Sequence, residues 1–215
     1  MLTIEMMHRR WPHANQHVPG LAEGIVRSAP AVFSKFGVAD KPMAVAHFMA
    51  QASEECGQGL EMWEDMNYTA ERLREIFPTH FTPTMAARWA HNPRMIANIA
   101  YGGRKELGNA PLPSDDGWNF RGRGLSQVTG REGYQRLHDS YVRAGVDLDI
   151  MGNPDFVCEP GYALEMGVAD WVLCGCLPHA IADNVLRETE ALNGGTNGLA
   201  ERVRQLASWK REFGL

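Results

Sequence analysis

The strongest constraint on the fold lies between residues 41 and 56, where apolar side chains recur at helical spacing. The stripe consists of Val45, Phe48, Met49 and Ala52. Glu55 follows Ala52 by three positions and lies on the same stripe, in the last turn of an amphipathic helix. Glu54 is turned roughly a quarter-circle away. Because apolar surroundings disfavour a charged carboxylate, we expect a raised pKa at Glu55.

A second acidic residue follows in a loop that is rich in aromatic and amide side chains. Glu64 comes nine positions after Glu55 and is flanked by Trp63, Asn67 and Tyr68. Aromatic rings stack on sugar rings, and amides hydrogen-bond to hydroxyl and N-acetyl groups. A carboxyl of raised pKa followed by a second carboxylate is typical of the acid and base of a glycosidase. Taken alone, Glu55 would fit a solvated helix end, since most acidic residues near helix ends belong to solvated surfaces.

Residues 118–130 predict a turn that enters a short strand. The glycines of this segment permit backbone conformations that other residues resist. In a strand, Arg123, Leu125, Gln127 and Thr129 alternate onto one face, so the amide and the hydroxyl point the same way. The alternative interpretation is a hairpin with a polar face and no chemistry.

Four motifs occur in a fixed order along the chain. They are Ala50-Gln51-x-Ser53-x-Glu55, the loop from Glu64 through residues 67–73, residues 120–131, and residues 192–199. Together they resemble family 19 glycoside hydrolases, and most closely the short endolysins with which bacteriophages cut host peptidoglycan. The resemblance covers about residues 40 to 210 of the chain.

The resemblance implies a mainly α, lysozyme-like fold of two lobes, with a small β-hairpin and a substrate cleft. It also implies an inverting mechanism, in which Glu55 matches the general acid and Glu64 the base. In inverting enzymes the two carboxyl groups stand roughly 6.5–9.5 Å apart, which leaves room for a water molecule.

The same resemblance assigns substrate-binding roles. Gln127 and Thr129 match residues that bind substrate and help to hold the attacking water. Asn193 matches the asparagine of an Asn-Gly-Gly turn, and Tyr68 belongs to the sugar-binding loop after Glu64.

Arg202 resembles the arginine that pairs with the catalytic carboxylates. Independently of the family, Arg202 lies beside Leu199 and Leu206 on a helical stripe, where a partly buried guanidinium requires an acidic partner. The alternative is a side chain whose stem packs and whose head reaches water.

Two positions depart from the family pattern. The residue before the catalytic glutamate is often histidine in the family and is Glu54 here. The family commonly has asparagine shortly before a tyrosine after Gly130, whereas this chain reads Arg131-Glu132-Gly133-Tyr134. The helical face favours Glu55 over Glu54 as the acid.

The two glutamates and the family resemblance predict a glycosidase that cleaves β-1,4 bonds next to N-acetylated amino sugars. The expected substrate is the glycan strands of peptidoglycan. Chitinase activity is the alternative within the same class, because both polymers offer this bond. A glycan-binding protein without hydrolysis is the alternative from another class, and the presence of both carboxylates counts against it.

Length and charge limit the remaining possibilities. We expect one catalytic domain, residues 1–215, acting as a monomer. No run approaches eighteen consecutive apolar residues, so we expect no membrane span. A net charge of −5 argues against nucleic acid and against binding driven by anionic membranes.

The four cysteines predict neither a disulfide framework nor a metal site. Cys174 and Cys176 are too close for an easy bridge, and their spacing fits none of the common zinc-ligand pairs. We expect four reduced, buried thiols. No phosphate-binding glycine loop precedes a helix, and we expect no cofactor.

The N-terminal residues have their basic side chains after a short apolar stretch, unlike a secretory signal. We therefore expect a protein made and folded in a cytoplasm. The resemblance to phage endolysins implies that this is the host cytoplasm, that a phage holin releases the protein and that it acts on the cell wall in the periplasm.

Helices are predicted near residues 20–36, 41–56, 70–77, 83–91, 93–100, 131–144, 160–175 and 197–212. Thr82 and Asn92 are predicted N-caps because a proline follows each of them, and Asp40 stands just ahead of Pro42. The Gly-, Pro- and Asp-rich stretch from residue 102 to about 119 predicts a long irregular loop at the side of the cleft.

Overall fold

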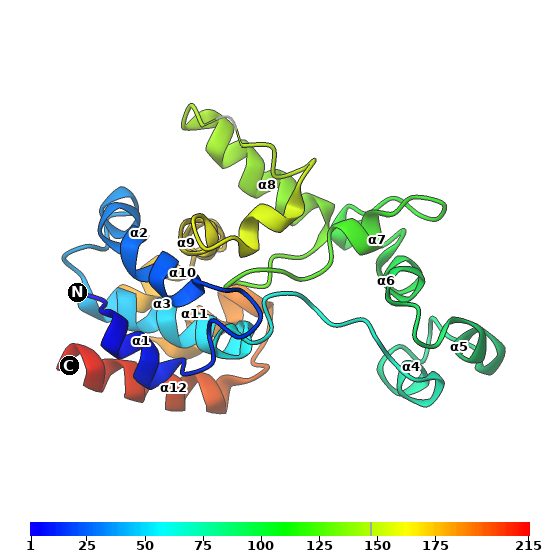
Figure 1. Cartoon of the computed structure of the whole chain (residues 1–215), viewed down its shortest axis with the longest axis horizontal. Coiled ribbons are helices and arrows are strands. Elements are labelled where there is room, and N and C mark those ends of the chain that lie inside the picture. The colour runs from blue at the N-terminus through cyan, green and yellow to red at the C-terminus, as the bar shows by residue number, and fades with distance from the viewer. Residues whose placement is uncertain (147) are drawn as a thin grey trace. The chain divides into compact units, whose positions relative to one another are not determined.

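The computed structural model describes residues 1–146 and 148–215, and its helices are joined by turns and loops (Figure 1). The predicted mainly α fold class is confirmed. The chain forms two compact units. Unit 1 contains Met1–Met62, Arg123–Gln127 and Asp155–Leu215, and unit 2 contains Trp63–Gly122 and Val128–Pro154. The organisation as one domain stays a prediction.

Unit 1 is built from helices of both ends of the chain. They are α1 (Ile4–Arg10), α2 (Leu21–Lys35), α3 (Pro42–Glu55), the 3-10 helix η1 (Gly57–Gly59), α9 (Ala163–Leu173), α10 (Cys176–Ile181), α11 (Val185–Asn193) and α12 (Leu199–Phe213). A further 3-10 helix, η3 (Pro154–Cys158), carries the chain from unit 2 back into unit 1.

α3 is the central helix of unit 1. All of its residues from Ala44 to Ser53 are buried, because α12, α10 and α9 pack against it. The expectation of one apolar stripe on an amphipathic helix is therefore wrong for α3. Alanines on the remaining faces allow neighbouring helices to approach closely, and each buried large side chain such as Phe48 or Met49 contributes roughly 1.5–3 kcal/mol.

Ser53 fixes the last turn of α3 just before Glu55. Its hydroxyl oxygen accepts hydrogen bonds from the indole N–H groups of Trp11, at 2.8 Å, and Trp209, at 2.9 Å. The hydroxyl itself donates to the carbonyl oxygen of Met49 at 2.6 Å. Both tryptophans are fully buried, so their N–H groups need such a partner. The end of α3 is thereby tied to α12 and to the segment after α1.

Unit 2 holds α4 (Ala70–Ile76), α5 (Pro83–Trp89), α6 (Pro93–Tyr101), the 3-10 helix η2 (Lys105–Leu107), α7 (Asp116–Asn119) and α8 (Gly130–Arg143). Its buried apolar cluster consists of Met66, Leu73, Phe81, Ala86, Ile96, Ala97 and Ala100. The loop that follows Glu64 enters this cluster through Met66, which anchors the loop to the helices of the same unit.

The eight predicted helices are all present, with ends shifted by up to three residues. The cap predictions at Thr82 and Asn92 are confirmed, since their side chains accept from the backbone N–H groups of Met85 and Met95. The expectation that Asp40 caps the helix that follows it is wrong. Lys41 occupies the N-cap position of α3, and no side chain caps this helix.

Four helices were not predicted: α1, α7, α10 and α11. They are seven, four, six and nine residues long, so each offers little apolar periodicity. α11 was not predicted for a further reason: the two side chains that it buries, Glu188 and Thr189, are both polar.

The predicted strand within residues 118–130 is wrong, and with it the small β-hairpin. Among the described residues the structure has isolated bridges at Trp63, Arg123 and Val128 and no extended strand. Gly124 and Gln127 have positive φ angles of 76° and 52°, so the chain turns here instead of alternating between two faces.

The loop after α6 contains more structure than predicted, since η2 and α7 lie within residues 102–119. α7 packs tightly on α6. A Cβ at Gly117 would stand 2.4 Å from the carbonyl oxygen of Ala97, so only glycine fits this contact. The expected position of this loop beside a cleft stays a prediction.

Over the described ranges, no helix is both long and apolar enough to cross a bilayer. All four thiols are free, as predicted, and Cys56, Cys158 and Cys176 are buried. Cys174 is half-buried, which corrects the expectation for this one residue. Burial raises the pKa of the Cys56 thiol to about 12, which makes it unreactive.

Candidate active site

Glu55 is the last residue of α3, and its carboxylate is paired with a buried arginine of α12. Arg202 Nη2 donates to Glu55 Oε1 at 2.6 Å, and the side chains of the arginine and the glutamate are 4% and 14% exposed. The expectation that Arg202 has an acidic partner is confirmed. The guanidinium therefore holds Oε1, one of the two oxygens of this carboxyl.

Asn193, the last residue of α11, bridges this ion pair. The hydrogen-bond network fixes the orientation of its amide. The amide nitrogen donates to Glu55 Oε1 at 2.9 Å, and the amide oxygen accepts from Arg202 Nη2 at 2.7 Å. Three predicted site residues, Glu55, Asn193 and Arg202, therefore meet in unit 1.

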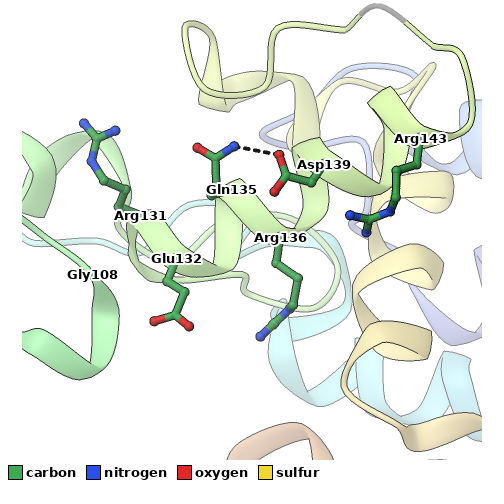
Figure 2. A pocket seen from close by; sticks show the side chains of 7 residues that line it. All are labelled: Gly108, Arg131, Glu132, Gln135, Arg136, Asp139 and Arg143. Carbon is green, nitrogen blue, oxygen red and sulfur yellow. Dashed lines mark hydrogen bonds between the residues drawn. The ribbon is translucent and has the colours of Figure 1, made fainter.

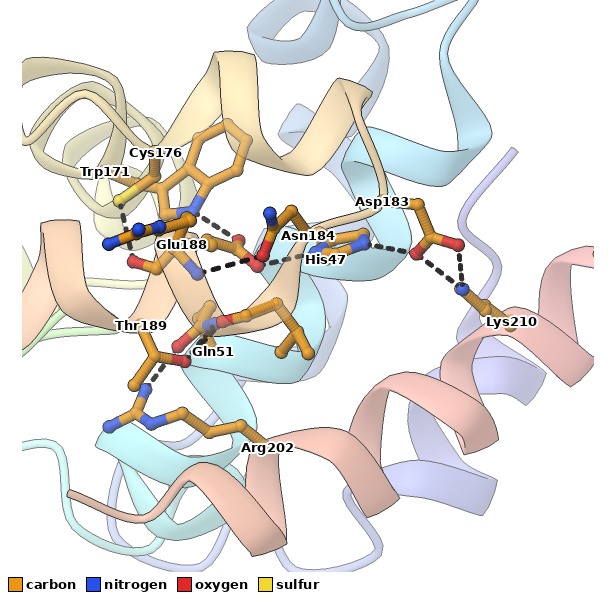
Figure 3. A network of polar contacts seen from close by, with 12 residues as sticks. His47, Gln51, Trp171, Cys176, Asp183, Asn184, Glu188, Thr189, Arg202 and Lys210 are labelled. Carbon is orange, nitrogen blue, oxygen red and sulfur yellow. Dashed lines mark hydrogen bonds and ion pairs between the residues drawn. The ribbon is translucent and has the colours of Figure 1, made fainter. Parts of the chain in front are cut away.

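Arg202 is held by further acceptors. Its Nη1 donates to Gln51 Oε1 at 2.5 Å, and its Nε donates to the carbonyl oxygen of Asn197 at 3.2 Å. Gln51 Nε2 in turn donates to Thr189 Oγ1 at 3.3 Å (Figure 3). These acceptors, together with Glu55, hold the guanidinium at three of its nitrogens.

The surroundings raise the pKa of Glu55. Burial is the largest cause, and the negative charge of Glu54 adds to it, whereas the charge and hydrogen bond of Arg202 and the hydrogen bond of Asn193 oppose the rise. A carboxyl that stays protonated nearer to neutral pH can serve as a general acid.

Glu54 faces a different neighbour. An added Cβ at Gly198, the N-cap residue of α12, would lie 2.6 Å from Glu54 Oε1. Glu54 therefore lies at the start of α12, where a carboxylate is favoured by the helix dipole. This placement supports the choice of Glu55 over Glu54 as the acid.

Glu64 lies in unit 2 and is held by neutral donors. The hydroxyl of Tyr101 donates to Glu64 Oε1, and the backbone N–H of Gly122 donates to Oε2 at 3.2 Å. The backbone N–H of Glu64 also donates to the carbonyl oxygen of Gly122 at 2.9 Å. A charged carboxylate offers about four lone-pair positions, so these contacts orient Glu64 and leave capacity for a water molecule.

Two tyrosines lie near Glu64 within unit 2, and one phenylalanine packs against both of them. Phe77 packs edge-on against both Tyr68 and Tyr101, with ring centroids 6.0 and 6.1 Å apart. Burial and then the charge of Glu64 raise the pKa of both tyrosines, so both hydroxyls stay protonated. Tyr68 thus belongs to the surroundings of Glu64, which fits its predicted place in the sugar-binding loop.

Gln127 and Thr129 lie in different units. Gln127 belongs to unit 1, and its amide nitrogen donates to the carbonyl oxygens of Glu61, at 2.9 Å, and Gly124, at 3.1 Å. Thr129 belongs to unit 2 and is the half-buried N-cap residue of α8. Their alternation on one strand is wrong, and their substrate-binding roles stay predictions.

No protein-family model matches the chain. A protein of Haemophilus influenzae described as "Glycosyl hydrolase family 19 domain-containing protein" is 33% identical over 191 residues, which cover 88% of this chain and 90% of that protein. This chain belongs to glycosyl hydrolase family 19. The family predicted from the four motifs is confirmed, and the chain is a glycoside hydrolase by family.

A solved structure shares the fold of this family 19 chain. Chitinase C from Streptomyces griseus HUT6037 has a TM-score of 0.57 and 18% sequence identity, over 99% of this chain and 92% of that chain. At this identity the likeness shows the fold alone. The separation of the Glu55 and Glu64 carboxyls in this family 19 chain stays a prediction, because the two residues belong to different units.

Several polar contacts of the family 19 chain were not predicted from the sequence. Tyr101 contacts Glu64 across 37 positions of the sequence. His47 and Glu188, buried near Gln51, are 141 positions apart. The spacing of three α3 residues could have predicted part of this arrangement. His47, Gln51 and Glu55 recur every four residues, which places them on one face of α3.

A departure from the family 19 pattern has a structural role. Arg131 donates to both carboxylate oxygens of Asp116, at 2.7 and 2.8 Å, and this pairing lowers the pKa of Asp116 to about 2. The contact ties the start of α8 to α7 within unit 2. The arginine at this position is therefore engaged in holding two helices together.

A hollow of about 490 Å³ lies on the exposed side of α8 in unit 2 (Figure 2). It is lined by Gly108, Arg131, Glu132, Gln135, Arg136, Asp139 and Arg143. Arg131 is already paired with Asp116, and the charges of Arg136 and Arg143 are balanced by those of Glu132 and Asp139. The hollow therefore has no charge excess that would select an anionic ligand.

Proposed function

We propose that this family 19 hydrolase cleaves β-1,4 glycosidic bonds in peptidoglycan glycan strands with inversion of configuration. The observation that carries the proposal is the Glu55 carboxyl, which is largely buried, has a raised pKa and is held on one oxygen by Arg202 and Asn193. This arrangement suits a group that begins protonated and ends charged.

In the proposed reaction, a single displacement, Glu55 Oε2 gives its proton to the oxygen of the leaving sugar as the glycosidic C–O bond breaks. The carboxylate that results is stabilised by the two donors already in place on Oε1, the guanidinium of Arg202 and the amide of Asn193. Because these donors are fixed before the reaction, they need no rearrangement as the charge develops.

In the same displacement, the Glu64 carboxylate removes a proton from a water molecule that attacks the opposite face of the sugar ring, and the water oxygen forms the new bond to the anomeric carbon. The Tyr101 hydroxyl and the Gly122 N–H hold the carboxylate in one orientation while this happens. Tyr68, Gln127 and Thr129 are the proposed substrate-binding residues. Asn193, which the family resemblance also assigns to substrate binding, is proposed to act mainly through its hydrogen bond to Glu55. The reaction requires no metal or cofactor in this scheme.

We further propose the biological role of a phage endolysin. The protein would accumulate in the host cytoplasm as a monomer, pass a holin-dependent lesion and degrade the wall from the periplasm, which causes lysis. The proposal rests on the order of the four sequence motifs. The net charge of −5 agrees with it, because an acidic protein gains no attraction to the anionic surface of intact cells.

The catalytic proposal is tested by digesting purified peptidoglycan strands and chitin oligomers side by side. Mass spectrometry identifies the new reducing end, and proton NMR at early times reports its anomeric configuration. We expect faster turnover of peptidoglycan and inverted product. Retained configuration would overturn the inverting mechanism, and no turnover of either polymer would favour a binding protein.

A chitin substrate is the second candidate, favoured by the chain's similarity in fold to a chitinase. Faster cleavage of chitin oligomers in the same digestion would replace the peptidoglycan proposal with this one.

The endolysin role has its own test. The purified protein should lyse Gram-negative cells whose outer membrane has been permeabilised, and should act weakly on intact cells from outside. A cationic peptide extension should improve external killing. Strong lysis of intact cells by the unmodified protein at physiological salt would contradict the role.

A further inference from the structure

In unit 1, α3 and α11 meet through polar side chains (Figure 3). The pairs are His47–Glu188, Gln51–Thr189 and Glu55–Asn193. We refer to these three pairs as the polar ladder. The α3 members are spaced four residues apart, so they lie on one face of that helix, and the last pair contains the proposed general acid.

His47 and Glu188 form the innermost pair, and both side chains are fully buried. His47 Nδ1 lies 2.5 Å from one Glu188 oxygen, and Trp171 Nε1 donates to the other oxygen at 2.9 Å. His47 Nε2 lies 2.9 Å from Asp183 Oδ1, and Lys210 Nζ donates to that same oxygen at 2.6 Å. Each charged group therefore has partners, which is the condition for tolerating buried charge.

The charge state of His47 supports this pairing. Burial disfavours the imidazolium, but the hydrogen bonds and charges of Glu188 and Asp183 outweigh burial and raise the pKa of His47. The stabilisation is complete below the ordinary histidine pKa of about 6.5 and is lost as the pH rises through the raised value.

α11 packs on α10 and α12, and its contacts with α3 are the hydrogen bonds of the polar ladder. It has nine residues, and a helix of this length is marginal on its own. Its fully buried residues, Glu188 and Thr189, are both polar. Thr189 accepts from Gln51 and donates to the carbonyl oxygen of Val185 at 2.7 Å. Hydrogen bonds in the polar ladder thus contribute strongly to how α11 sits on α3.

We propose that His47 and Glu188 are positioning residues for the glycosidic reaction, because they fix α11 on α3 and α11 presents Asn193 to Glu55. The inference rests on the proposed function, since it takes Glu55 as the general acid. Asn193 follows Glu188 by about one and a half helical turns, so a small tilt of α11 displaces its amide from Glu55 Oε1. Such a displacement affects the chemical step more than substrate binding.

A double-mutant cycle tests this dependence. We expect Glu188→Gln to lower kcat about tenfold, with KM changed less than about twofold. In the Asn193→Ala background the same substitution should lower kcat less than about twofold, because its effect passes through Asn193. The matched control is Glu190→Gln on the same helix, whose side chain pairs with Arg187 at 2.7 Å; it should leave kcat unchanged.

A second measurement does not depend on activity. Carbon-13 NMR of glutamate-labelled protein follows the titration of Glu55, assigned by its absence in Glu55→Gln. We expect Glu188→Gln to raise the pKa of Glu55 by roughly half a unit, because a weakened Asn193 contact removes a donor from the carboxylate. The Glu190→Gln control should leave this titration in place.

The outcomes are distinct. An equal loss of kcat in both backgrounds, or a loss with no change in the Glu55 titration, would overturn the positioning role. If the wild-type protein turned over no glycan, the proposed function would fail while the titration still decided the positioning role. Should Glu188→Gln not fold, Trp171→Phe takes its place in the cycle, since it removes one donor to Glu188 and keeps a large ring.

Discussion

The two predicted catalytic glutamates are held by different chemistry in the two units. In unit 1, Glu55 is largely buried and paired with a cation, Arg202. In unit 2, Glu64 accepts hydrogen bonds from neutral donors, the hydroxyl of Tyr101 and the N–H of Gly122. The difference fits the two proposed roles, because a proposed acid that becomes charged gains from a compensating cation, whereas a proposed base needs orientation and unused lone pairs.

Replacing the acid should have the largest effect. Glu55→Gln keeps the shape of the side chain and removes only the transferable proton, so we expect turnover of peptidoglycan strands to fall by about four orders of magnitude. Circular dichroism should show an unchanged fold. An aryl glycoside substrate, whose leaving group needs no protonation, should be affected much less, and equal losses on both substrates would contradict the acid role.

Replacing the proposed base, Glu64, should have the second-largest effect on turnover. We expect Glu64→Gln to lower kcat at least about a hundredfold, because no carboxylate remains to activate the water. Unlike the acid variant, this one should be impaired equally on the aryl glycoside and on the natural strands. Recovery of activity on the aryl substrate would show that the roles of Glu55 and Glu64 are exchanged.

Removing the positive charge of Arg202 tests whether a cation beside Glu55 is what distinguishes its surroundings from those of Glu64. Arg202→Met takes away the charge and the hydrogen bond that hold down the pKa of Glu55, so this pKa should rise above its already raised value. We expect the alkaline limb of the pH profile of kcat/KM to move to higher pH. We also expect kcat to fall about tenfold or more, since the developing carboxylate loses a charged donor. An alkaline limb that stays in place would argue that another group titrates there.

The hydroxyl that orients the base should matter less. Tyr101→Phe keeps the ring that packs on Phe77 and removes the donor to Glu64 Oε1. We expect kcat to fall by about threefold to tenfold, which is the scale of one hydrogen bond. Tm should change little, and a large drop in Tm with normal kcat would assign Tyr101 a purely structural role.

Glu54→Gln should have the smallest effect. It removes a charge that raises the pKa of Glu55, so the alkaline limb of the pH profile should move slightly to lower pH. We expect kcat at neutral pH to change less than about threefold, as is usual for a side chain outside the chemistry. If Glu54→Gln abolishes turnover and Glu55→Gln is mild, Glu54 is the acid.

Much of the fold follows from local signals. The helices with clear caps, such as those that begin after Thr82 and Asn92, lie where the sequence predicts them. α11 was not predicted because its buried side is polar, whereas helix prediction from sequence depends on apolar periodicity. The predicted strand through Gln127 failed because a positive φ at a non-glycine residue has no reliable sequence signature.

In the candidate site, too, some features were predicted from local sequence signals and others depend on tertiary contacts. The sequence alone determined the family, the acidic residue at the end of α3 and the need of Arg202 for an acidic partner, because helical spacing and motif order are local or ordered along the chain. Only the tertiary structure decided that Tyr101 holds Glu64 and that the polar ladder joins His47 to Glu188. These pairs lie 37 and 141 positions apart, and hydrogen bonds over such separations exist only once packing has brought the helices together.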